Sequence, residues 1–417
     1  MNFRLFSWSL LSFTVLSIVG PQVVAAQGWQ MVFAQNVGDV EAIASDAGHI
    51  YAGTDNGVFV SADNGRTWVQ KNNGLANLEI FSFTITPMGT VLAGTEGGGI
   101  FRSTDFGENW QAANAGLPDT SNIPCLTSDR FGNIFAGHSE QGVFYSSDDG
   151  QHWSQRNTGM GNESIFSLTI TPSDSVYAGS GSGGAGSIPI IFASPDLGLH
   201  WDTSYGGLAS GDEVFALASD SSGDVFAGTY KAKRLRLFAD STAWEDISPF
   251  ASSSLDEVKS LACDGDVLYA GFFGSYVGRS YDRGSTWKLD TAGLTDPKIY
   301  SLTVTPQGYL FAGTFLAEVF RTTGPLGVGK GVPNSTLALW PEPFRSSALL
   351  SFALAKGGPV HVALYDALGR DVCEAFSRTL PEGPQRIAID PELSAGVYTL
   401  VLTTPDGVYT RSCSTVR

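Results

Sequence analysis

One tripeptide recurs along this chain and constrains its fold more than any other feature. An aromatic residue or leucine is followed by Ala-Gly seven times, with about 42 residues between successive copies. The copies are Tyr51 to Gly53, Leu92 to Gly94, Phe135 to Gly137, Tyr177 to Gly179, Phe226 to Gly228, Tyr269 to Gly271 and Phe311 to Gly313. A repeat of this length predicts that one structural unit is built seven times.

A second motif, Ser-x-Asp-x-Gly-x-x-Trp, lies between these copies. It is intact at Ser61 to Trp68, Ser103 to Trp110, Ser146 to Trp153, Ser194 to Trp201 and Ser280 to Trp287, and a shortened sixth copy runs from Asp240 to Trp244. Around these marks each unit contains four short strands separated by turn residues. A sheet of this size cannot bury both faces alone, so neighbouring units must stack, and radial stacking predicts a β-propeller.

The seventh unit keeps its Ala-Gly but has no Trp and no fourth strand after Phe320 to Gly324. At the other end of the repeats, residues 29–33 lead into Val40 to Ile43 in the way that Trp68 leads into the next unit. We therefore expect residues 29–33 to pair into the last blade, which closes a ring of seven blades without a covalent bond.

The second motif resembles the Asp-box, or bacterial neuraminidase repeat, of sialidases, xyloglucanase-type glycosidases, sortilin-like receptors and photosystem II assembly propellers. The resemblance covers about residues 29–325. It implies a structural role for the box aspartates, whose carboxylates can accept turn N–H groups. These aspartates are Asp63, Asp105, Asp148, Asp196 and Asp282. The box indicates a fold and not a reaction.

The ends of the chain predict export and a second domain. Arg4, the apolar run Leu10 to Val19 and the small residues before Gln27 read as a signal peptide over residues 1–26. We expect the propeller at residues 27–325, a Gly/Pro-rich linker at 326–336 and a small immunoglobulin-like β-sandwich at 337–417. No later segment is long and apolar enough to be a transmembrane helix.

The last segment is similar to the C-terminal sorting domain of the type IX secretion system. The matching residues are Trp340-Pro341-Glu342-Pro343-Phe344, Tyr365-Asp366-Ala367-Leu368-Gly369-Arg370 and Ser394-Ala395-Gly396-Val397-Tyr398. Glu342 replaces the usual Asn, and the chain ends in Arg417 where the family has a lysine-rich strand. The resemblance implies that residues 337–417 engage the type IX machinery, with release or attachment at the cell surface. An ordinary accessory sandwich is the alternative.

Charge and cysteine content agree with an exported protein. The net charge of −17 disfavours nucleic acid as a partner. Cys125 and Cys263 lie at positions that other blades fill with small or apolar residues, so we expect both to be structural. Cys373 and Cys413 lie in the second domain, where an exported chain permits a disulfide. Neither a zinc motif nor a cofactor motif occurs, so we expect no metal and no cofactor.

The candidate ligand surface is the rim that carries the loops after each Ala-Gly, where the blades differ. Two residues beyond the glycine the blades carry, in order, Asp55, Glu96, Ser139, Gly181, Tyr230, Phe273 and Phe315. Tyr230, Phe273 and Phe315 form an aromatic arc suited to sugar rings or peptide side chains. A basic cluster, Lys231, Lys233, Arg234 and Arg236, and an insertion at residues 180–187 fall on the same rim. Alternatively, the aromatic residues only cover blade edges.

An enzyme is the second hypothesis. Asp55 and Glu96, in adjacent blades, are weak candidates for the carboxylate pair of a glycoside hydrolase. Sialidase activity is disfavoured because no Arg-Ile-Pro motif occurs and the arginines fall at non-equivalent positions. The sequence therefore favours a secreted or surface-displayed propeller that binds a polysaccharide or protein. A glycoside hydrolase and a scaffold for envelope assembly remain as alternatives.

Overall fold

The computed structural model describes most of the chain beyond its N-terminal segment. The described residues are 28–323 without 36, 47, 119–120, 161–163, 182–188, 206, 232, 240, 249–256 and 266, and 338–415 without 341–347, 355–356, 366–370, 382, 390–392, 394–395 and 405–406. The predicted signal peptide, the linker 326–336, most of the insertion 180–187 and most residues of the sorting-domain motifs lie outside them. The described residues form strands and no helix, as the predicted all-β fold class requires.

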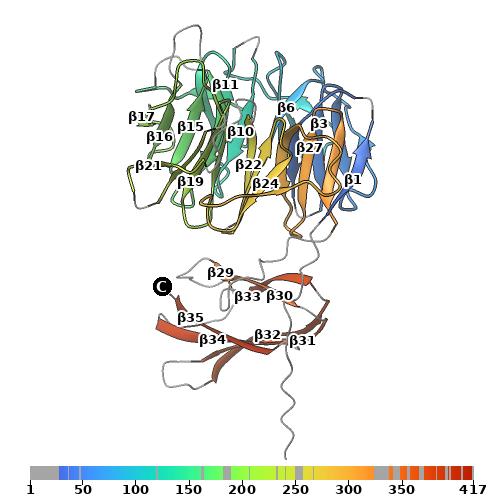
Figure 1. The fold of residues 1–417 in the computed structure, drawn as a ribbon, viewed down its shortest axis with the longest axis vertical. Coiled ribbons are helices and arrows are strands. Elements are labelled where there is room, and N and C mark those ends of the chain that lie inside the picture. The colour runs from blue at the N-terminus through green and yellow to red at the C-terminus, as the bar shows by residue number, and fades with distance from the viewer. Residues whose placement is uncertain are drawn as a thin grey trace, which may run out of the picture.

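Seven four-stranded sheets form a ring of blades (Figure 1). Blade one holds β2 (Val40–Ser45), β3 (Ile50–Thr54), β4 (Gly57–Ser61) and β5 (Val69–Gln70); blade two holds β6 (Ile80–Ile85), β7 (Val91–Thr95), β8 (Ile100–Ser103) and β9 (Gln111–Ala112). Blade three holds β10 (Cys125–Ser128), β11 (Ile134–His138), β12 (Gly142–Ser146) and β13 (Ser154–Gln155); blade four holds β14 (Ile165–Ile170), β15 (Val176–Ser180), β16 (Ile191–Ser194) and β17 (Asp202–Tyr205). Blade five holds β18 (Val214–Ser219), β19 (Val225–Thr229), β20 (Arg234–Leu237) and β21 (Trp244–Asp246); blade six holds β22 (Val258–Asp264), β23 (Val267–Phe272), β24 (Val277–Ser280) and β25 (Lys288–Asp290). Blade seven holds β26 (Ile299–Val304), β27 (Leu310–Thr314), β28 (Glu318–Thr322) and, as its outermost strand, β1 (Trp29–Ala34).

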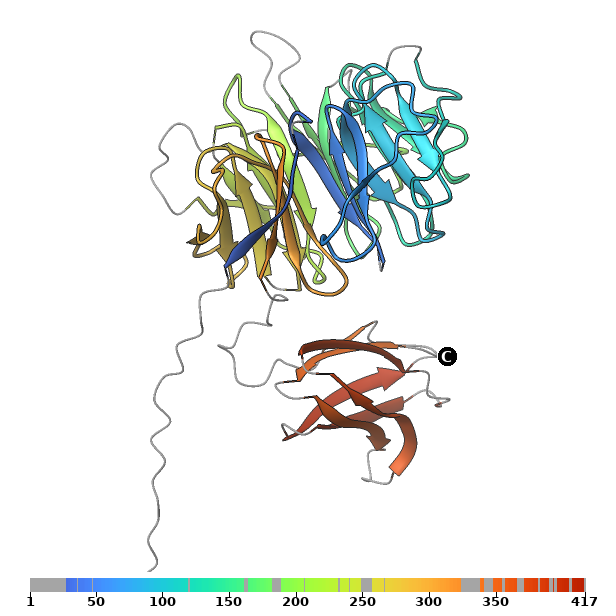
Figure 2. The same cartoon turned by 90° about the vertical axis from the view of Figure 1, so that its right-hand side faces the viewer.

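Strand β1 closes the ring, as the sequence predicts. It pairs antiparallel with β28, with Trp29 opposite Thr322 and Met31 opposite Phe320. The innermost strand of each blade contacts that of the next, including β26 of blade seven with β2 of blade one. Figure 2 shows the blue β1 beside the orange strands of the last blade. The first and last segments of the ring are thus held together by strand pairing alone.

The glycine of each Ala-Gly lies where successive blades come closest. A Cβ atom on Gly53 would lie 2.6 Å from Cγ2 of Ile80 in the next blade. One on Gly179 would lie 2.5 Å from Cγ1 of Val214. A larger residue would force the blades apart, which explains why glycine recurs here.

A small residue on the innermost strand also links the blades. The Ser82 hydroxyl donates to the Ile123 carbonyl of the next blade (2.9 Å), and Ser167 and Ser301 make the equivalent bonds. Cys125 takes this place in blade three, with its Sγ 3.7 Å from the Ile165 carbonyl oxygen. Burial raises the pKa of its thiol. Cys125 is therefore a structural residue, as its position in the repeat predicts.

Each intact box is a turn that is closed by its own aspartate. The Asp63 carboxylate accepts hydrogen bonds from the Thr67 backbone N–H (2.8 Å), the Thr67 hydroxyl (2.7 Å) and the Ser61 hydroxyl (2.9 Å). The same arrangement surrounds Asp105, Asp148, Asp196 and Asp282. The carboxylates are therefore occupied within the turns.

Two of these turns contain a histidine that binds the aspartate. Burial by itself would raise the pKa of Asp148, but hydrogen bonds from the backbone and ring of His152 lower it to about 2. The backbone and ring of His200 likewise lower the pKa of Asp196 to about 2. These histidines are turn residues, as their places in the boxes predict.

A cation from the preceding blade binds a backbone carbonyl in each intact box. The carbonyl belongs to the residue before the box glycine, which has a positive φ. The pairs are Arg321 to Asn64, Lys71 to Phe106, Arg102 to Asp149, Arg156 to Leu197 and Arg236 to Arg283. Arg102 and Arg321 lie at equivalent positions on the third strand, contrary to the expectation of non-equivalent positions, whereas Arg156 follows the fourth strand and still reaches an equivalent carbonyl. Lys71 and Arg156 do not align with the other cations, because they lie beside the fourth strand of a blade and the others extend from the third.

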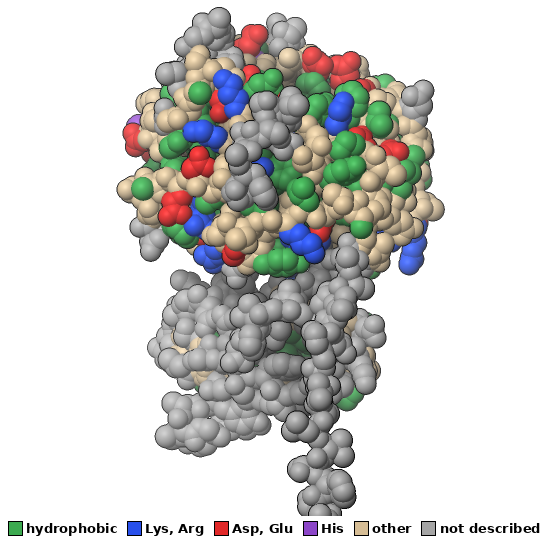
Figure 3. Space-filling model, in the orientation of Figure 1, with side chains coloured by type: hydrophobic (Ala, Val, Ile, Leu, Met, Phe, Trp, Pro, Cys, Tyr) green, Lys and Arg blue, Asp and Glu red, His purple; other side chains and the backbone are tan. Residues whose placement is uncertain are grey.

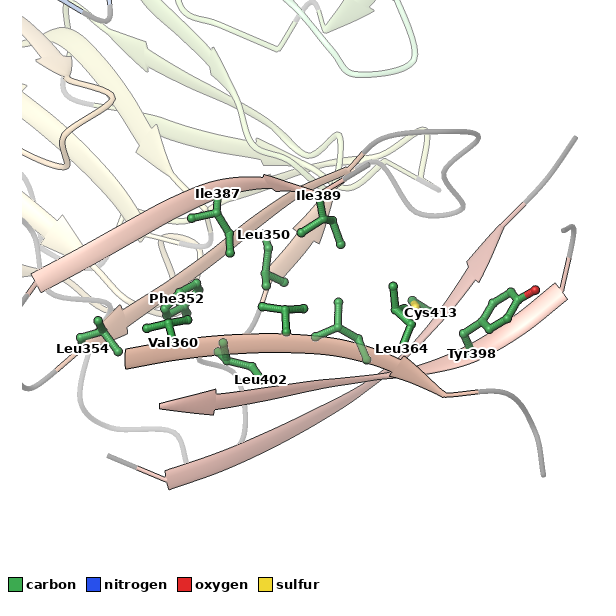
Figure 4. Packing of buried hydrophobic residues seen from close by; sticks show 12 residues of the cluster. Leu350, Phe352, Leu354, Val360, Leu364, Ile387, Ile389, Tyr398, Leu402 and Cys413 are labelled. Carbon is green, nitrogen blue, oxygen red and sulfur yellow. The ribbon is translucent and has the colours of Figure 1, made fainter. Parts of the chain in front are cut away.

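The described residues after 337 form two sheets that share one core. One sheet contains β29 (Ala338–Trp340), β30 (Ala348–Leu354) and β33 (Gly383–Ile389); the other contains β32 (Asp371–Leu380), β31 (Gly358–Tyr365), β34 (Gly396–Thr404) and β35 (Gly407–Thr415). Figure 4 shows their apolar side chains between the sheets, among them Leu350, Ile387, Val360 and Leu402. Two facing sheets are the arrangement expected for a small sandwich.

The sheet register argues against the predicted Cys373–Cys413 bond. Cys373 lies in β32 and Cys413 in β35, on the two outer strands of one sheet, and the structure has no disulfide between them. Neighbouring strands lie about 4.8 Å apart, whereas a disulfide needs Cα atoms within about 7 Å. The two intervening strands, β31 and β34, keep the cysteines too far apart to bond.

The chain leaves the ring at the rim that carries the boxes, because β28 ends there. On the same side, Arg386 of β33 lies 3.6 Å from Asp264 at the end of β22, and Figure 1 draws the two sheets on that side of the ring. On the face that Figure 3 shows, basic, acidic and apolar side chains are interspersed over the blades. The opposite rim, with the loops after each Ala-Gly, points away from these sheets.

Candidate functional site

Backbone hydrogen bonds define the Ala-Gly rim. In six blades the residue two positions after the glycine donates its backbone N–H to a carbonyl in the segment that leads into the innermost strand of the same blade. Examples are Glu96 to Glu79 (3.1 Å), Tyr230 to Glu213 (2.9 Å) and Phe315 to Lys298 (3.1 Å). The loops after Ala-Gly and the linkers between blades therefore share one rim, as the sequence predicts.

In six of the seven blades a β-bulge turns one residue toward the mouth of the central channel. Strand pairing shifts by one residue on the innermost strands of six blades. The bulged residues, here called the collar, are Glu41, Phe81, Phe166, Phe215, Lys259 and Tyr300, and all are partly exposed. A bulge leaves its residue outside the ladder and re-aims the side chain. In blade three Pro124 precedes β10 at the equivalent place.

Blades five to seven place seven side chains in one network, here called the aromatic–lysine arc. The arc consists of Phe215, Tyr230, Lys259, Phe273, Lys298, Tyr300 and Phe315. Lys259 Nζ lies 3.7 Å from the ring centroid of Phe215, 5.8 Å from that of Phe273 and 6.0 Å from that of Tyr300. The rings contact one another at centroid distances of 5.5 to 6.1 Å. Cation–π and edge contacts of this kind hold the arc in a fixed arrangement.

Blades one and two carry the acidic arc, which consists of Asp39, Glu41, Asp55, Glu79 and Glu96. The Asp39 backbone N–H donates to Asp55 Oδ2 (3.2 Å), and the Asp39 carboxylate accepts a hydrogen bond from the Tyr300 hydroxyl. Burial, followed by the charges of Asp39 and Asp55, raises the pKa of Glu41 to about 7 against the opposing charge of Lys259. The protonated form of Glu41 is thus favoured well above the pH at which an exposed glutamate ionises.

The other carboxyls of this arc also interact. A hydrogen bond with Glu79, followed by burial, raises the pKa of Glu96. Burial, followed by the charge of Asp55, raises the pKa of Asp39 against the hydrogen bond from Tyr300. The Tyr300 hydroxyl therefore connects the two arcs where blade seven meets blade one.

The predicted site residues divide into two groups. Asp55 and Glu96 come together in the acidic arc, and Tyr230, Phe273 and Phe315 belong to the aromatic–lysine arc. Tyr230 is 44% exposed and Phe315 is 37% exposed, so both can be reached by a ligand. These five residues therefore lie around one channel mouth.

The predicted basic cluster does not form one surface. Arg234 is only 7% exposed, and its guanidinium packs 4.6 Å from the ring centroid of Phe272. Arg236 is also buried and binds Glu245 (2.7 Å). The interpretation of Arg234 as a ligand contact is wrong, because a side chain packed between blades is not accessible. Lys231 and Lys233 stay near the rim, with Lys231 Nζ donating to the Ser210 carbonyl (2.7 Å).

Sequence reasoning missed Asp39, Glu41, Glu79, Phe215, Lys259, Lys298 and Tyr300. The collar residues directly precede the small residue that links the blades, as Phe81 precedes Ser82 and Tyr300 precedes Ser301. An alignment of the blades at this small residue shows Glu41 and Lys259 where four other blades carry an aromatic residue and blade three carries Pro124. This difference in residue type was the signal in the sequence that could have identified Glu41 and Lys259 as site residues.

Other features of the described residues lie outside the rim or point to no ligand. A pocket of about 390 Å³ lies on the outer side of blade one, near Val69, Lys71 and Glu108. The part of the chain that the structure describes holds no cluster of three or more His, Cys, Asp or Glu side chains able to bind a metal. None of its residues belongs to a helix with the length and apolarity needed to cross a membrane.

Taken with the ring of sheets, this rim defines a β-propeller protein. Residues 22–205 match a family model described as the DUF6242 beta propeller domain. No similar protein was found among the curated proteins.

Solved structures support the same fold. The chain is similar to PorZ, an essential bacterial surface component of the type-IX secretion system of Porphyromonas gingivalis, with a TM-score of 0.56 and 16% identity over 91% of this chain and 60% of PorZ. It is also similar to the extracellular domain of the putative one component system BT4673 from B. thetaiotaomicron (TM-score 0.59, 17% identity, 92% of this chain and 52% of that one). A third similar structure is YCF48 bound to D1 peptide (TM-score 0.59, 15% identity, 74% of this chain and 99% of that one). The chain spans only part of PorZ and about half of the BT4673 domain, and these identities indicate a shared fold.

Proposed function

We propose that this protein is an exported recognition module that binds a protein or polysaccharide ligand at the mouth of its channel, on the Ala-Gly rim. The observation that carries the proposal is the aromatic–lysine arc. Ordered rings provide apolar area at low entropic cost, and lysines beside them fix orientation. The other rim is less suited, because its box aspartates and carbonyls already have partners.

A binding screen tests the proposal. The chain without residues 1–26 is applied to glycan and peptide arrays, and both binding and released reducing sugar are measured. We expect Tyr230→Ala and Phe315→Ala to weaken binding by about tenfold or more, as for aromatic residues at the centre of an interface. Phe131→Ala is the matched control, because Phe131 is 69% exposed on the box rim. Equal effects of all three variants would refute the placement of the site.

A glycoside hydrolase is the second candidate. It is favoured by the raised pKa of Glu41 close to Asp55, because glycosidases pair a protonated acid with an ionised carboxylate. In this scheme Asp55 and Glu96, the residues first considered, are joined by Glu41 as the acid. Sugar release that survives Asp55→Ala, Glu96→Ala and Glu41→Gln would exclude it. Binding without release leaves the recognition module.

We also propose that the ring belongs to the Asp-box propellers, that residues 1–26 form a signal peptide, and that residues 337–417 are a type IX sorting domain. The box turns, the two facing sheets after residue 337 and the similarity of the fold to PorZ support these assignments. Truncation after residue 336 tests the last one. We expect the truncated chain to remain in the periplasm of a type IX-competent host while the full chain reaches the surface. Surface delivery of both chains would contradict it.

A further inference from the structure

Lys298 is the feature of the channel mouth that the proposed function leaves unexplained. Its Nζ lies 4.1 Å from the ring centroid of Phe315 and 4.9 Å from that of Phe273. Lys259, by contrast, pairs with Glu257 (3.0 Å). Among the described residues no carboxylate lies within ion-pair distance of Lys298. The ammonium of Lys298 is therefore held by two rings, and although its charge lowers the pKa of Asp39 it forms no ion pair with that carboxyl, so it can accept an anion.

An apolar surface adjoins this ammonium. Phe315 is 37% exposed and the next residue, Leu316, is 62% exposed. The Leu316 backbone N–H donates to Asp296 Oδ2 (3.0 Å), which fixes the loop that carries both side chains. A cation beside an ordered apolar surface fits a ligand in which a carboxylate lies next to an apolar group.

The acidic arc limits which anionic ligand can bind. It begins next to blade seven, where Tyr300 bonds to Asp39, and continues through Asp55 to Glu96. A regularly charged polymer that extended from Lys298 across the mouth would place further carboxylates against this arc. Like charges at short distance are a strong element of discrimination.

We propose that the ligand is a protein segment in which an acidic residue directly adjoins an apolar one, with its carboxylate on Lys298 and its apolar side chain on Phe315 and Leu316. This inference rests on the proposed function and specifies the ligand of the same site. A polyanionic polysaccharide is disfavoured, because its charges repeat along the whole chain.

The experiment uses the chain without residues 1–26 and a random dodecapeptide library displayed on phage. The library is selected on this chain alone, so that peptides whose binding does not need Lys298 are also recovered. Enriched peptides are synthesised, and their affinities are measured by fluorescence anisotropy at low and high salt. Lys298→Gln supplies a milder change, and Lys288→Glu is the matched control because Lys288 is an exposed lysine on the outer strand β25. Thermal melting checks that each variant is folded.

We expect the enriched peptides to carry Asp or Glu beside Leu, Ile, Met or Phe. Their affinity should fall by about tenfold or more in both Lys298 variants, stay unchanged in Lys288→Glu and weaken with salt. Peptides without this pair whose binding needs Phe315 but not Lys298 would overturn the inference and leave the proposed site intact. Binding that needs neither Phe315 nor Tyr230 would overturn both. Polygalacturonate, included as a second probe, overturns the choice of a protein ligand if it binds in a Lys298-dependent way and the peptides do not.

Discussion

Replacing Glu41 by Gln should stabilise the protein at neutral pH. Glu41 lies in the collar, where burial and the charges of Asp39 and Asp55 raise its pKa from 4.5 to about 7. In the unfolded chain Glu41 ionises near pH 4.5, whereas in the folded chain it keeps its proton up to about pH 7. Between these values the folded state binds one proton more, so stability is lost as the pH rises.

The pKa shift sets the size of the effect. Each unit of pKa is worth about 1.4 kcal/mol, so the folded state loses up to about 3 kcal/mol from this group between pH 4.5 and about pH 8. A neutral Gln of nearly the same shape avoids this loss. For a ring of this size the gain corresponds to a rise in Tm of roughly 6 °C at pH 8, and to none at pH 4.5.

Urea unfolding and thermal melting of both proteins across this pH range provide the assay. Other carboxyls titrate in both proteins, so the difference between their stability curves isolates Glu41. Glu140→Gln is the control, since Glu140 is exposed on blade three of the same rim. If the free energy of unfolding changed with pH in the same way for the native chain and Glu41→Gln across the whole range, the inference that the collar desolvates Glu41 would be refuted.

Three further predictions concern the contacts that hold the ring, and a fourth concerns the cysteines. Arg321→Met removes the guanidinium that binds the Asn64 carbonyl of blade one (2.6 Å) and should cost about 2 kcal/mol in urea unfolding; an unchanged midpoint would contradict the role of the inter-blade cations. Gly179→Ala places a Cβ 2.5 Å from Cγ1 of Val214 and should cost about 1–3 kcal/mol, against a near-neutral change for Gly48→Ala, because Gly48 is exposed, has no positive φ and has its nearest neighbouring atom 3.8 Å from an added Cβ. Asp148→Ala should lower the free energy of unfolding above about pH 4. The difference between the two proteins should shrink as the pH falls toward 2, because the pKa of Asp148 in the folded state is lowered to about 2. A difference in stability that persists at low pH would contradict this. Thiol titration of the unfolded, unreduced protein should find all four cysteines reactive.

The architecture was predictable because the same contacts repeat in every blade. The glycine of Ala-Gly and the small residue on the innermost strand each make a packing contact between blades that recurs around the ring. The box aspartate closes a turn that recurs in the same way. Gly53, Ser82 and Asp63 therefore have counterparts at regular spacing, and this regularity is visible in one sequence. The closing strand β1 could be inferred because the last unit lacked its outermost strand.

The candidate site was only partly predictable, for a physical reason. The direction of a collar side chain is set by a bulge, and a bulge changes strand pairing without requiring a particular residue. Glu41 and Lys259 therefore had no motif to mark them. The prediction for Arg234 was wrong for the opposite reason, since its charge suggested a surface residue while its guanidinium packs over the ring of Phe272.

The ring restricts where recognition can evolve. Positions that keep the blades in register, such as Gly179 and Asp148, cannot vary without loss of packing, so they carry no specificity. The box rim is further constrained, since its carboxylates and carbonyls bind groups of the same or the preceding blade. Only the collar and the loops after Ala-Gly are free to differ between blades, and there the chain places lysines and rings on one side and carboxylates on the other. Such differences between blades give a ring of similar units a site with a basic, aromatic side and an acidic side. For this reason the charge of Lys298 is the one whose change tests ligand recognition most directly.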